Sequence, residues 1–206
     1  MVAAVNDQDW PDSVKSLAAG FPELINRMAE HSDWTETMGE ALVSQTDDVL
    51  VSIQRLRAQA QVNGYLADLE SKDLIARPVP VANHIAWQLG HVIAAERFLV
   101  EKAVPGKMDA LPEGFVDRHK KGTAASDNAA DFLSKDGYLE LAGKVRANTL
   151  RVVESLSPTD FDQPASGGPP FVTNVGQALL FISHHWMMHA GQWAVIRRKL
   201  GRPPLF

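Results

Sequence analysis

Three histidines are the residues whose type and spacing suggest chemistry in this chain. His185 and His189 stand four apart in a proline-free stretch, Val175–Leu200, that is expected to be helical. Residues four apart lie one turn above each other on a helix, so two imidazoles at this spacing can direct ring nitrogens at one point. Ile182 and Trp193 share the same stripe, so the pair faces the core. Buried imidazoles need partners, and a shared divalent metal supplies one.

A third ligand is expected from His91, which lies in a second mostly apolar helical stretch, 83–96. For any one of these histidines alone, a hydrogen-bonded core or boundary residue is the commoner interpretation, because two histidines four apart are a weak pattern. Two separate apolar helices that each carry an inward histidine favour the metal site. The His185 to His189 pair lacks the glutamate of a His-Glu-x-x-His motif, so a zinc protease is not indicated.

Helical offsets from these ligands predict which side chains border the site. Trp87, His184 and Met188 are expected near a pocket beside the metal. His184 follows its helix about 100° away from His185, so it is interpreted as a neighbour rather than a ligand. The competing interpretation for Trp87, Trp186, Met187, Met188 and Trp193 is ordinary core packing.

Other polar residues around these motifs have two interpretations each. Gln88 could orient a ligand or pack in the ordinary way, and Glu96 is expected to form an ion pair or to support the site. His84 could line the pocket mouth, although a surface histidine at a helix start is the commoner role. His119 lies in a long loop that could cover the site, and the default expectation for that loop is exposure to solvent.

The elements that must position the three histidines are helices, because convincing strand alternation is missing throughout the chain. Four long helices are predicted: Met38–Leu69, Val81–Lys102, one from about Ser134 to Leu156, and Val175–Leu200. Ser134 and Thr173 are the expected N-caps of the last two, and Gly201 the stop of the last. A polar loop, Val104–Asn128, follows the second helix. The fold class is therefore all-α, a four-helix bundle over residues 38–206 with an additional N-terminal helical extension over residues 1–37.

Composition narrows the function classes. Apolar residues make up 45% of the 206 and charged residues 22%, which is ordinary for a globular protein. No apolar run is long enough for a membrane span, and no signal peptide is visible, which favours the cytoplasm. The net charge of −5 and the short basic runs argue against nucleic acid as the main partner. Cysteine is absent, so the chain offers no thiolate ligand or nucleophile of its own.

Two segments together resemble the DinB/YfiT-like superfamily. The first is Trp87-Gln88-Leu89-Gly90-His91; the second runs from His185-Trp186-Met187-Met188-His189 to Leu200-Gly201-Arg202-Pro203-Pro204, approached through Leu156-Ser157-Pro158. The likeness covers roughly residues 38–206. It implies a four-helix bundle that binds a divalent metal through His91, His185 and His189. The family includes bacillithiol and mycothiol S-transferases, a thiol-dependent isomerase, the helical domain of ergothioneine-type sulfoxide synthases and many members without a known activity.

The leading hypothesis is a metal-dependent enzyme of the thiol S-transferase or hydrolase type, with three histidine ligands and one open coordination position. Zinc and nickel are the first candidates for the metal, followed by iron. The expected partners are a small-molecule substrate, for which a low-molecular-weight thiol is one candidate, and a second copy of the chain in a homodimer. The alternatives are a non-catalytic metal-binding bundle associated with stress, and a bundle whose histidines bind no metal.

Overall fold

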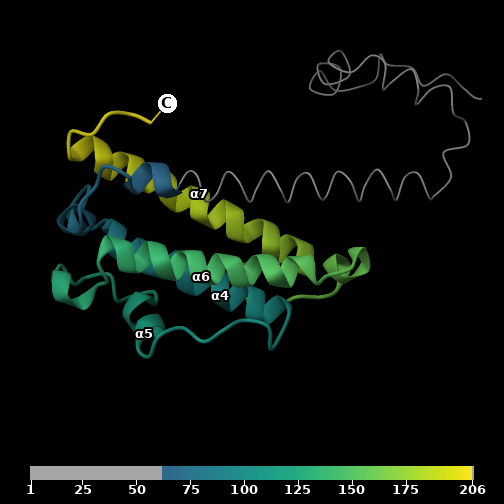
Figure 1. Cartoon of the computed structure of the whole chain (residues 1–206). Coiled ribbons are helices and arrows are strands. Elements are labelled where there is room, and N and C mark those ends of the chain that lie inside the picture. Colours follow the sequence, from purple (N-terminus) through teal and green to yellow (C-terminus); the bar gives the residue numbers. More distant parts are fainter. Residues whose placement is uncertain (1–61, 206) are drawn as a thin grey trace, which may run out of the picture. The chain divides into compact units, whose positions relative to one another are not determined.

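The computed structural model describes residues 62–205, which form a helical bundle (Figure 1). The long helices are α4 (Ile85–Ala103), α6 (Lys135–Glu154) and α7 (Val175–Lys199), and α5 (Phe115–His119) is short. Helices α4 and α6 run parallel, and α7 runs antiparallel to both. Three 3-10 helices, Ser71–Ile75, Ala129–Asp131 and Pro158–Asp162, lie in the connections. The predicted extension, residues 1–37, and most of the first predicted helix lie outside the described residues. Within the described part there is no strand, only one isolated bridge between Pro164 and Asn174, so the prediction of an all-α class is confirmed.

Helix α4 begins four residues later than the predicted start at Val81, and His84 is the reason. The backbone of His84 is extended (φ −78°, ψ 162°), and its Nδ1 accepts a hydrogen bond from the Trp87 amide at 3.1 Å, which caps the helix. The prediction that His84 stands at a helix start is therefore right, but the expectation of a surface position is wrong. Its side chain is fully buried and its Nε2 lies 3.0 Å from the Ser126 carbonyl oxygen.

Side-chain caps also fix the starts of the other two long helices. Ser134 Oγ accepts from the Gly137 amide at 3.1 Å, as predicted for α6. For α7 the predicted cap, Thr173, is wrong by one residue: Asn174 Oδ1 accepts from the Gln177 amide at 2.8 Å. The helix ends at Lys199, and Gly201 follows with φ at 70°, the left-handed conformation expected of a stop residue.

The long connection between α4 and α6 is only partly the solvated loop that the sequence predicts. It contains α5, whose Phe115 and His119 are 5% and 1% exposed. The turn into α5 passes through Gly114, with φ at 71°. Phe115 and His119 stand one helical turn apart and pack this five-residue helix against α4. The three residues between them face solvent.

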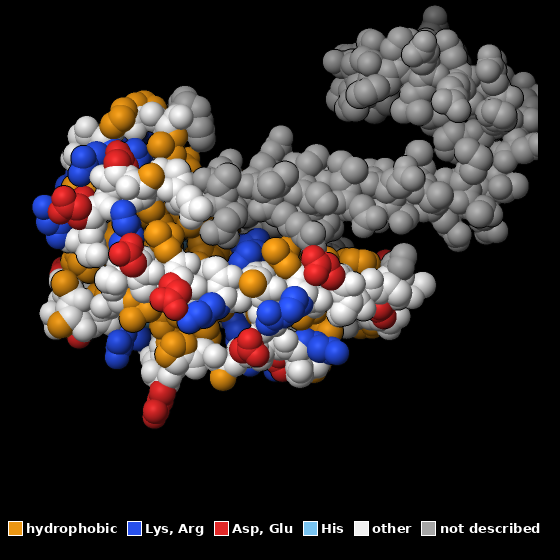
Figure 2. Space-filling model, viewed as in Figure 1, with side chains coloured by type: hydrophobic (Ala, Val, Ile, Leu, Met, Phe, Trp, Pro, Cys, Tyr) orange, Lys and Arg blue, Asp and Glu red, His pale blue; other side chains and the backbone are white. Residues whose placement is uncertain are grey.

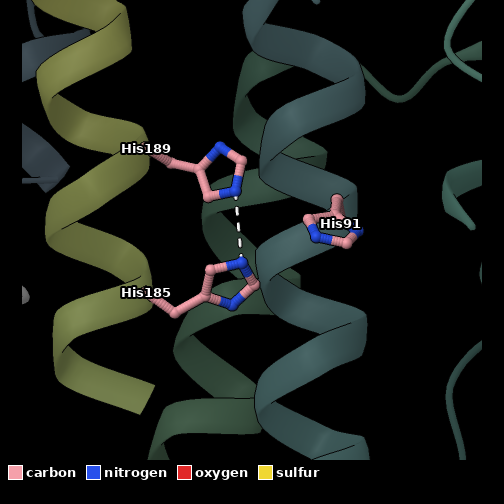
Figure 3. Close-up of side chains that lie close together, drawn as sticks. All are labelled: His91, His185 and His189. Atoms are coloured by element: carbon pink, nitrogen blue, oxygen red, sulfur yellow. Dashed lines mark hydrogen bonds between the residues drawn. The ribbon is translucent and has the colours of Figure 1, made fainter. Parts of the chain in front are cut away.

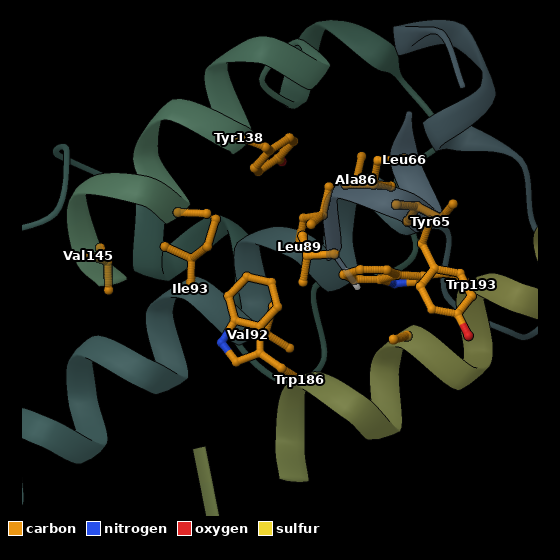
Figure 4. Packing of buried hydrophobic residues seen from close by; sticks show 14 of the residues in the cluster. Tyr65, Leu66, Ala86, Leu89, Val92, Ile93, Tyr138, Val145, Trp186 and Trp193 are labelled. Atoms are coloured by element: carbon orange, nitrogen blue, oxygen red, sulfur yellow. The ribbon is translucent and has the colours of Figure 1, made fainter. Parts of the chain in front are cut away.

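The core lies between α4, α6 and α7 (Figure 4). Leu89 and Ile93 of α4 and Trp193 of α7 are fully buried, and Trp186 is 4% exposed. The interpretation of the tryptophans as core residues therefore holds. It is wrong for Met187 and Met188, which are 41% and 54% exposed because they project from the outer side of α7.

The surface of the described residues carries no membrane-spanning signal, since none of their helices is long and apolar enough to cross a bilayer. On the face drawn in Figure 2, acidic and basic side chains are interspersed, with apolar side chains between them. This distribution is typical of an ordinary hydrated protein surface.

A buried glutamate joins the three long helices. Glu96 of α4 is 1% exposed, and its carboxylate accepts hydrogen bonds from Arg146 Nη2 (2.9 Å), Thr149 Oγ1 (2.8 Å) and Trp186 Nε1 (2.7 Å). Arg146 and Thr149 belong to α6 and Trp186 to α7. The expectation that Glu96 forms an ion pair is thus met, and the pair is buried enough to fix how the helices pack.

Replacing Glu96 by alanine should therefore lower the free energy of unfolding by about 3 kcal/mol, because Arg146 would keep its charge in a mostly buried place without a partner. Urea denaturation followed by circular dichroism measures this loss. Glu140→Ala is the matched control, since Glu140 pairs with Lys144 at the exposed surface of α6 and should matter far less. Equal losses for the two variants would contradict a structural role for the buried network.

Candidate metal centre

Three imidazole rings meet between α4 and α7. His91 projects from α4 and His185 and His189 from successive turns of α7 (Figure 3). One ring nitrogen of each lies within 4.8 Å of the others, and the ring centroids are 4.9 to 5.4 Å apart. The structure therefore brings together the three residues that the sequence pattern selected, including His91, which stands almost a hundred positions from the pair.

The spacing of these nitrogens is close to what one ion requires. Nitrogens bound at about 2.0–2.1 Å to a tetrahedral zinc ion stand roughly 3.3 Å apart. His185 Nε2 and His189 Nε2 are 3.2 Å apart. Small rotations of the side chains would bring His91 to the same spacing, since its donor already lies within 4.8 Å of both. Distance and donor chemistry both fit a divalent ion, and among the described residues no carboxylate joins the three rings.

The orientation of the His189 ring is set by Gln88 of α4. Gln88 Nε2 donates to the Asn83 carbonyl at 2.7 Å, so its Oε1 must be the atom that faces His189 Nδ1 at 3.0 Å. An amide oxygen can only accept, so the proton of His189 lies on Nδ1 and the lone pair of Nε2 points into the cluster. Gln88 is 1% exposed and orients the His189 ring, which agrees with one of its two predicted roles.

The His91 ring is held in a similar way from the opposite side. Its Nδ1 lies 3.3 Å from the backbone carbonyl oxygen of His119, which again assigns the proton to Nδ1 and the lone pair to Nε2. Trp87, one turn earlier on α4, stacks on the ring with a centroid distance of 4.9 Å and an interplanar angle of 6°. The prediction that Trp87 borders the site thus agrees with its position.

The His185 ring is positioned by stacking. Phe181, one turn earlier on α7, lies 5.6 Å from it with an interplanar angle of 13°. Phe181 in turn meets Phe171 edge to face at 5.7 Å. Between His185 and His189, two Nε2 atoms face each other, and two lone pairs repel unless one nitrogen carries a proton or an ion sits between them.

Burial keeps these imidazoles neutral at pH 7. It lowers the pKa of His189 to about 3 and that of His185 to about 4, with a further lowering of both by neighbouring histidines. Burial also lowers the pKa of His91, against the opposing effect of its hydrogen bond to the His119 carbonyl. Only a neutral imidazole has a lone pair to give to a metal, so the electrostatics of the site agree with its geometry.

The other two predicted pocket residues, His184 and Met188, occupy exposed positions on α7, where Met188 is 54% exposed. Among the described residues, no hydrogen bond or ring contact links either of them to the three imidazoles. His184 therefore takes the neighbouring position that its rotation from His185 predicts, and its place in a pocket remains a prediction.

The prediction of a solvent-exposed position for His119 is wrong. The residue is buried at 1% exposure and supplies the carbonyl that orients His91. The signal in the sequence is Gly90: a Cβ at this position would lie 2.1 Å from the ring of His119. A glycine in the middle of a helix indicates close approach by another part of the chain, but it does not say which part.

A helical bundle with an inward cluster of three histidines is the class of protein that this fold and site define. A family model described as the DinB superfamily matches residues 54–193. The chain therefore belongs to the DinB superfamily, as the resemblance of its histidine motifs predicts.

Three further matches cover different parts of the chain. A family described as a protein of unknown function, DUF3300, matches residues 1–96 and so overlaps the DinB match. The uncharacterized protein YacH of Escherichia coli (strain K12) is 42% identical over 83 residues, which are 39% of this chain and 13% of YacH. A crystal structure of a conserved protein from Enterococcus faecalis has a TM-score of 0.56 at 14% identity, covering 74% of this chain and 96% of that one. This likeness extends to the fold alone.

Lowering the pH should destabilise the metal-free protein through these histidines. The folded-state pKa values of His185 and His189 lie below the ordinary 6.5, so the unfolded chain binds more protons as the pH falls below it. Their contribution to stability is therefore complete above about pH 6.5 and is lost as the pH falls through the folded-state pKa values, about 4 for His185 and about 3 for His189. Urea midpoints measured in the presence of a chelator should show this loss. In a His185→Gln/His189→Gln variant the urea midpoint should fall less steeply with pH. An unchanged pH dependence in that variant would contradict the burial of neutral rings.

Proposed function

We propose that this protein binds one divalent metal ion through His91, His185 and His189 and uses it in catalysis on a small molecule. The observation that carries the proposal is the convergence of three neutral imidazoles from two facing helices, with one donor nitrogen of each within 4.8 Å of the others. Hydrogen bonds at Nδ1 of His91 and His189 leave Nε2 of each ring as the donor.

The donor set bears on which metal is bound. Three imidazole nitrogens suit zinc and nickel, and also iron. Catalytic sites commonly combine three protein ligands with one position for water or substrate, whereas structural sites have four protein ligands. A carboxylate from α6 could have closed the site as a fourth ligand, but within the described residues no carboxylate joins the three rings. This supports an open position and thus an enzyme.

The reaction that we propose is transfer of a low-molecular-weight thiol to an electrophile. When bound, the metal would supply Lewis acidity that favours the thiolate of the thiol near neutral pH. The thiol proton passes to solvent, the sulfur forms a bond to an electrophilic carbon, and the leaving group departs with the electrons of the broken bond. Because the chain contains no cysteine, the thiol must come from the substrate. Hydrolysis, in which water takes the place of the thiol, is the related reaction.

A non-catalytic metal-binding bundle is the alternative from another class. The stacking of Trp87 on His91 and of Phe181 on His185 does not distinguish an enzyme from a non-catalytic metal-binding protein, because it also serves a purely structural role. Turnover of any substrate would exclude this alternative. The homodimer and the cytoplasmic location stay predictions.

Metal analysis of untagged protein tests the binding site. The wild-type chain should retain or take up one divalent ion per molecule. His185→Ala should lower the affinity by at least roughly a hundredfold, because it removes a ligand rather than a residue that orients one. Competition against a chromophoric chelator measures the constants.

His184→Ala is the matched control for that measurement. It removes an imidazole from the adjacent, exposed position of the same helix and should leave the affinity unchanged. Wild-type protein that binds no stoichiometric metal, or equal losses in the two variants, would overturn the proposed site.

A screen of thiols tests the chemistry. Metal-loaded protein should accelerate the loss of free thiol when bacillithiol, mycothiol or glutathione is mixed with an electrophile, and His189→Ala should abolish the acceleration. Mass spectrometry identifies the thioether product. A metal-loaded protein that gives neither thioether nor hydrolysis product across such a screen would favour the non-catalytic alternative.

A further inference from the structure

Gly90 of α4 leaves room for the imidazole of His119. A Cβ on residue 90 would lie 2.1 Å from Cδ2, 2.3 Å from Nε2 and 2.4 Å from Cγ of that ring. These distances are too short for any carbon side chain, so an alanine could be accepted only if the ring moved. Glycine in the interior of a helix is less favourable than alanine, and here the lack of a side chain is required by the ring packed against the backbone.

The His119 ring has little freedom to move. Its Nδ1 donates to the Phe115 carbonyl at 2.8 Å, and its Nε2 then accepts from the Tyr138 hydroxyl, also at 2.8 Å. His119 and Tyr138 are 1% and 0% exposed. The ring is thus anchored to α5 on one side and to α6 on the other while it lies against α4.

The backbone of the same segment reaches the candidate metal ligand. The His119 carbonyl oxygen lies 3.3 Å from His91 Nδ1. Four residues later, Thr123 Oγ1 accepts from Trp87 Nε1 at 3.1 Å, and Trp87 stacks on the His91 ring. The segment 115–123 therefore holds one ring nitrogen of His91 and also the residue that covers the ring's face.

We infer that the segment 115–123 is a positioning element for His91, seated by the packing of the His119 ring on Gly90, and that it sets the metal affinity of the site proposed above. Gly90, His119 and Tyr138 act through His91 and not on the metal. The carbonyl of His119 selects the tautomer of His91 with its proton on Nδ1, which presents Nε2 to the ion.

Gly90→Ala is the direct test. The new methyl group should displace the His119 ring, and with it the carbonyl that orients His91, so the affinity for Zn²⁺ or Co²⁺ should fall by about 10- to 100-fold. Gly143→Ala is the matched control: Gly143 is also a helix-interior glycine, and a Cβ there would meet nothing within 4 Å. It should leave the affinity unchanged.

Two double variants separate positioning from a general effect on folding. In a His119→Ala background, Gly90→Ala should cause no further loss, because the ring that the methyl would strike is gone. In a His91→Ala background it should also cause no further loss, since the segment acts through His91. A Gly90→Ala loss that persists in the His91→Ala background would overturn the inference.

Imidazole nitrogen NMR on metal-free protein provides a second readout, which does not depend on metal binding. His91 should carry its proton on Nδ1 in the wild type and lose this preference in Gly90→Ala. Failure of the wild type to bind metal would refute the proposed function, whereas an unaltered His91 tautomer and unchanged affinity in Gly90→Ala would refute this inference alone.

If Gly90→Ala does not fold, Tyr138→Phe applies the same test by removing only the hydroxyl that anchors His119, with a smaller expected loss in affinity. An unchanged affinity and tautomer in that variant would likewise count against the inference.

Discussion

The site depends on one constraint: three imidazole rings are buried between α4 and α7, away from water. Burial penalises the charged form of each ring, so all three are neutral, and each neutral ring then has one N–H that needs an acceptor. For His189 the acceptor is Gln88, and for His91 it is the His119 carbonyl. His185 Nε2 lies 3.2 Å from His189 Nε2, a contact that is costly unless a proton of His185 or a cation lies between the two nitrogens.

The packing of the bundle has its own buried polar group, separate from the imidazoles. Glu96 binds a cation, a hydroxyl and an indole from two neighbouring helices, and Arg146 also lies over the ring of Trp186 at 5.8 Å. The negative charge of Glu96 is balanced by the positive charge of Arg146. Helices α4, α6 and α7 can therefore pack without an ion, and the histidine cluster can be preorganised before any metal arrives.

Periodicity along single helices made part of this site predictable. The spacing of His185 and His189 and the apolar stripe around them determine which way both rings point, and the same reasoning places His91 inward on α4. His119 was not predictable in this way, because its burial depends on a five-residue helix docking against a glycine 29 positions earlier in the chain. Capping shows the same limit on a smaller scale: Thr173 and Asn174 are both good caps, and only the observed backbone selects Asn174. The predicted first helix cannot be judged, since most of it lies outside the described residues.

The three rings differ in how firmly they are held, and this difference suggests how the cluster could close on an ion. Gln88 and the segment 115–123 fix His189 and His91 through hydrogen bonds at Nδ1. His185 is half-buried, and within the described residues its ring is held by stacking on Phe181 and by its contact with His189 Nε2. Stacking restrains the tilt of a ring but allows it to slide in its own plane. The Nε2 atoms of His185 and His189 are already 3.2 Å apart, so the remaining step toward the roughly 3.3 Å spacing around a tetrahedral ion is the approach between this pair and the His91 nitrogen, which lies within 4.8 Å of both. The His185 ring can follow such a movement with the fewest contacts broken.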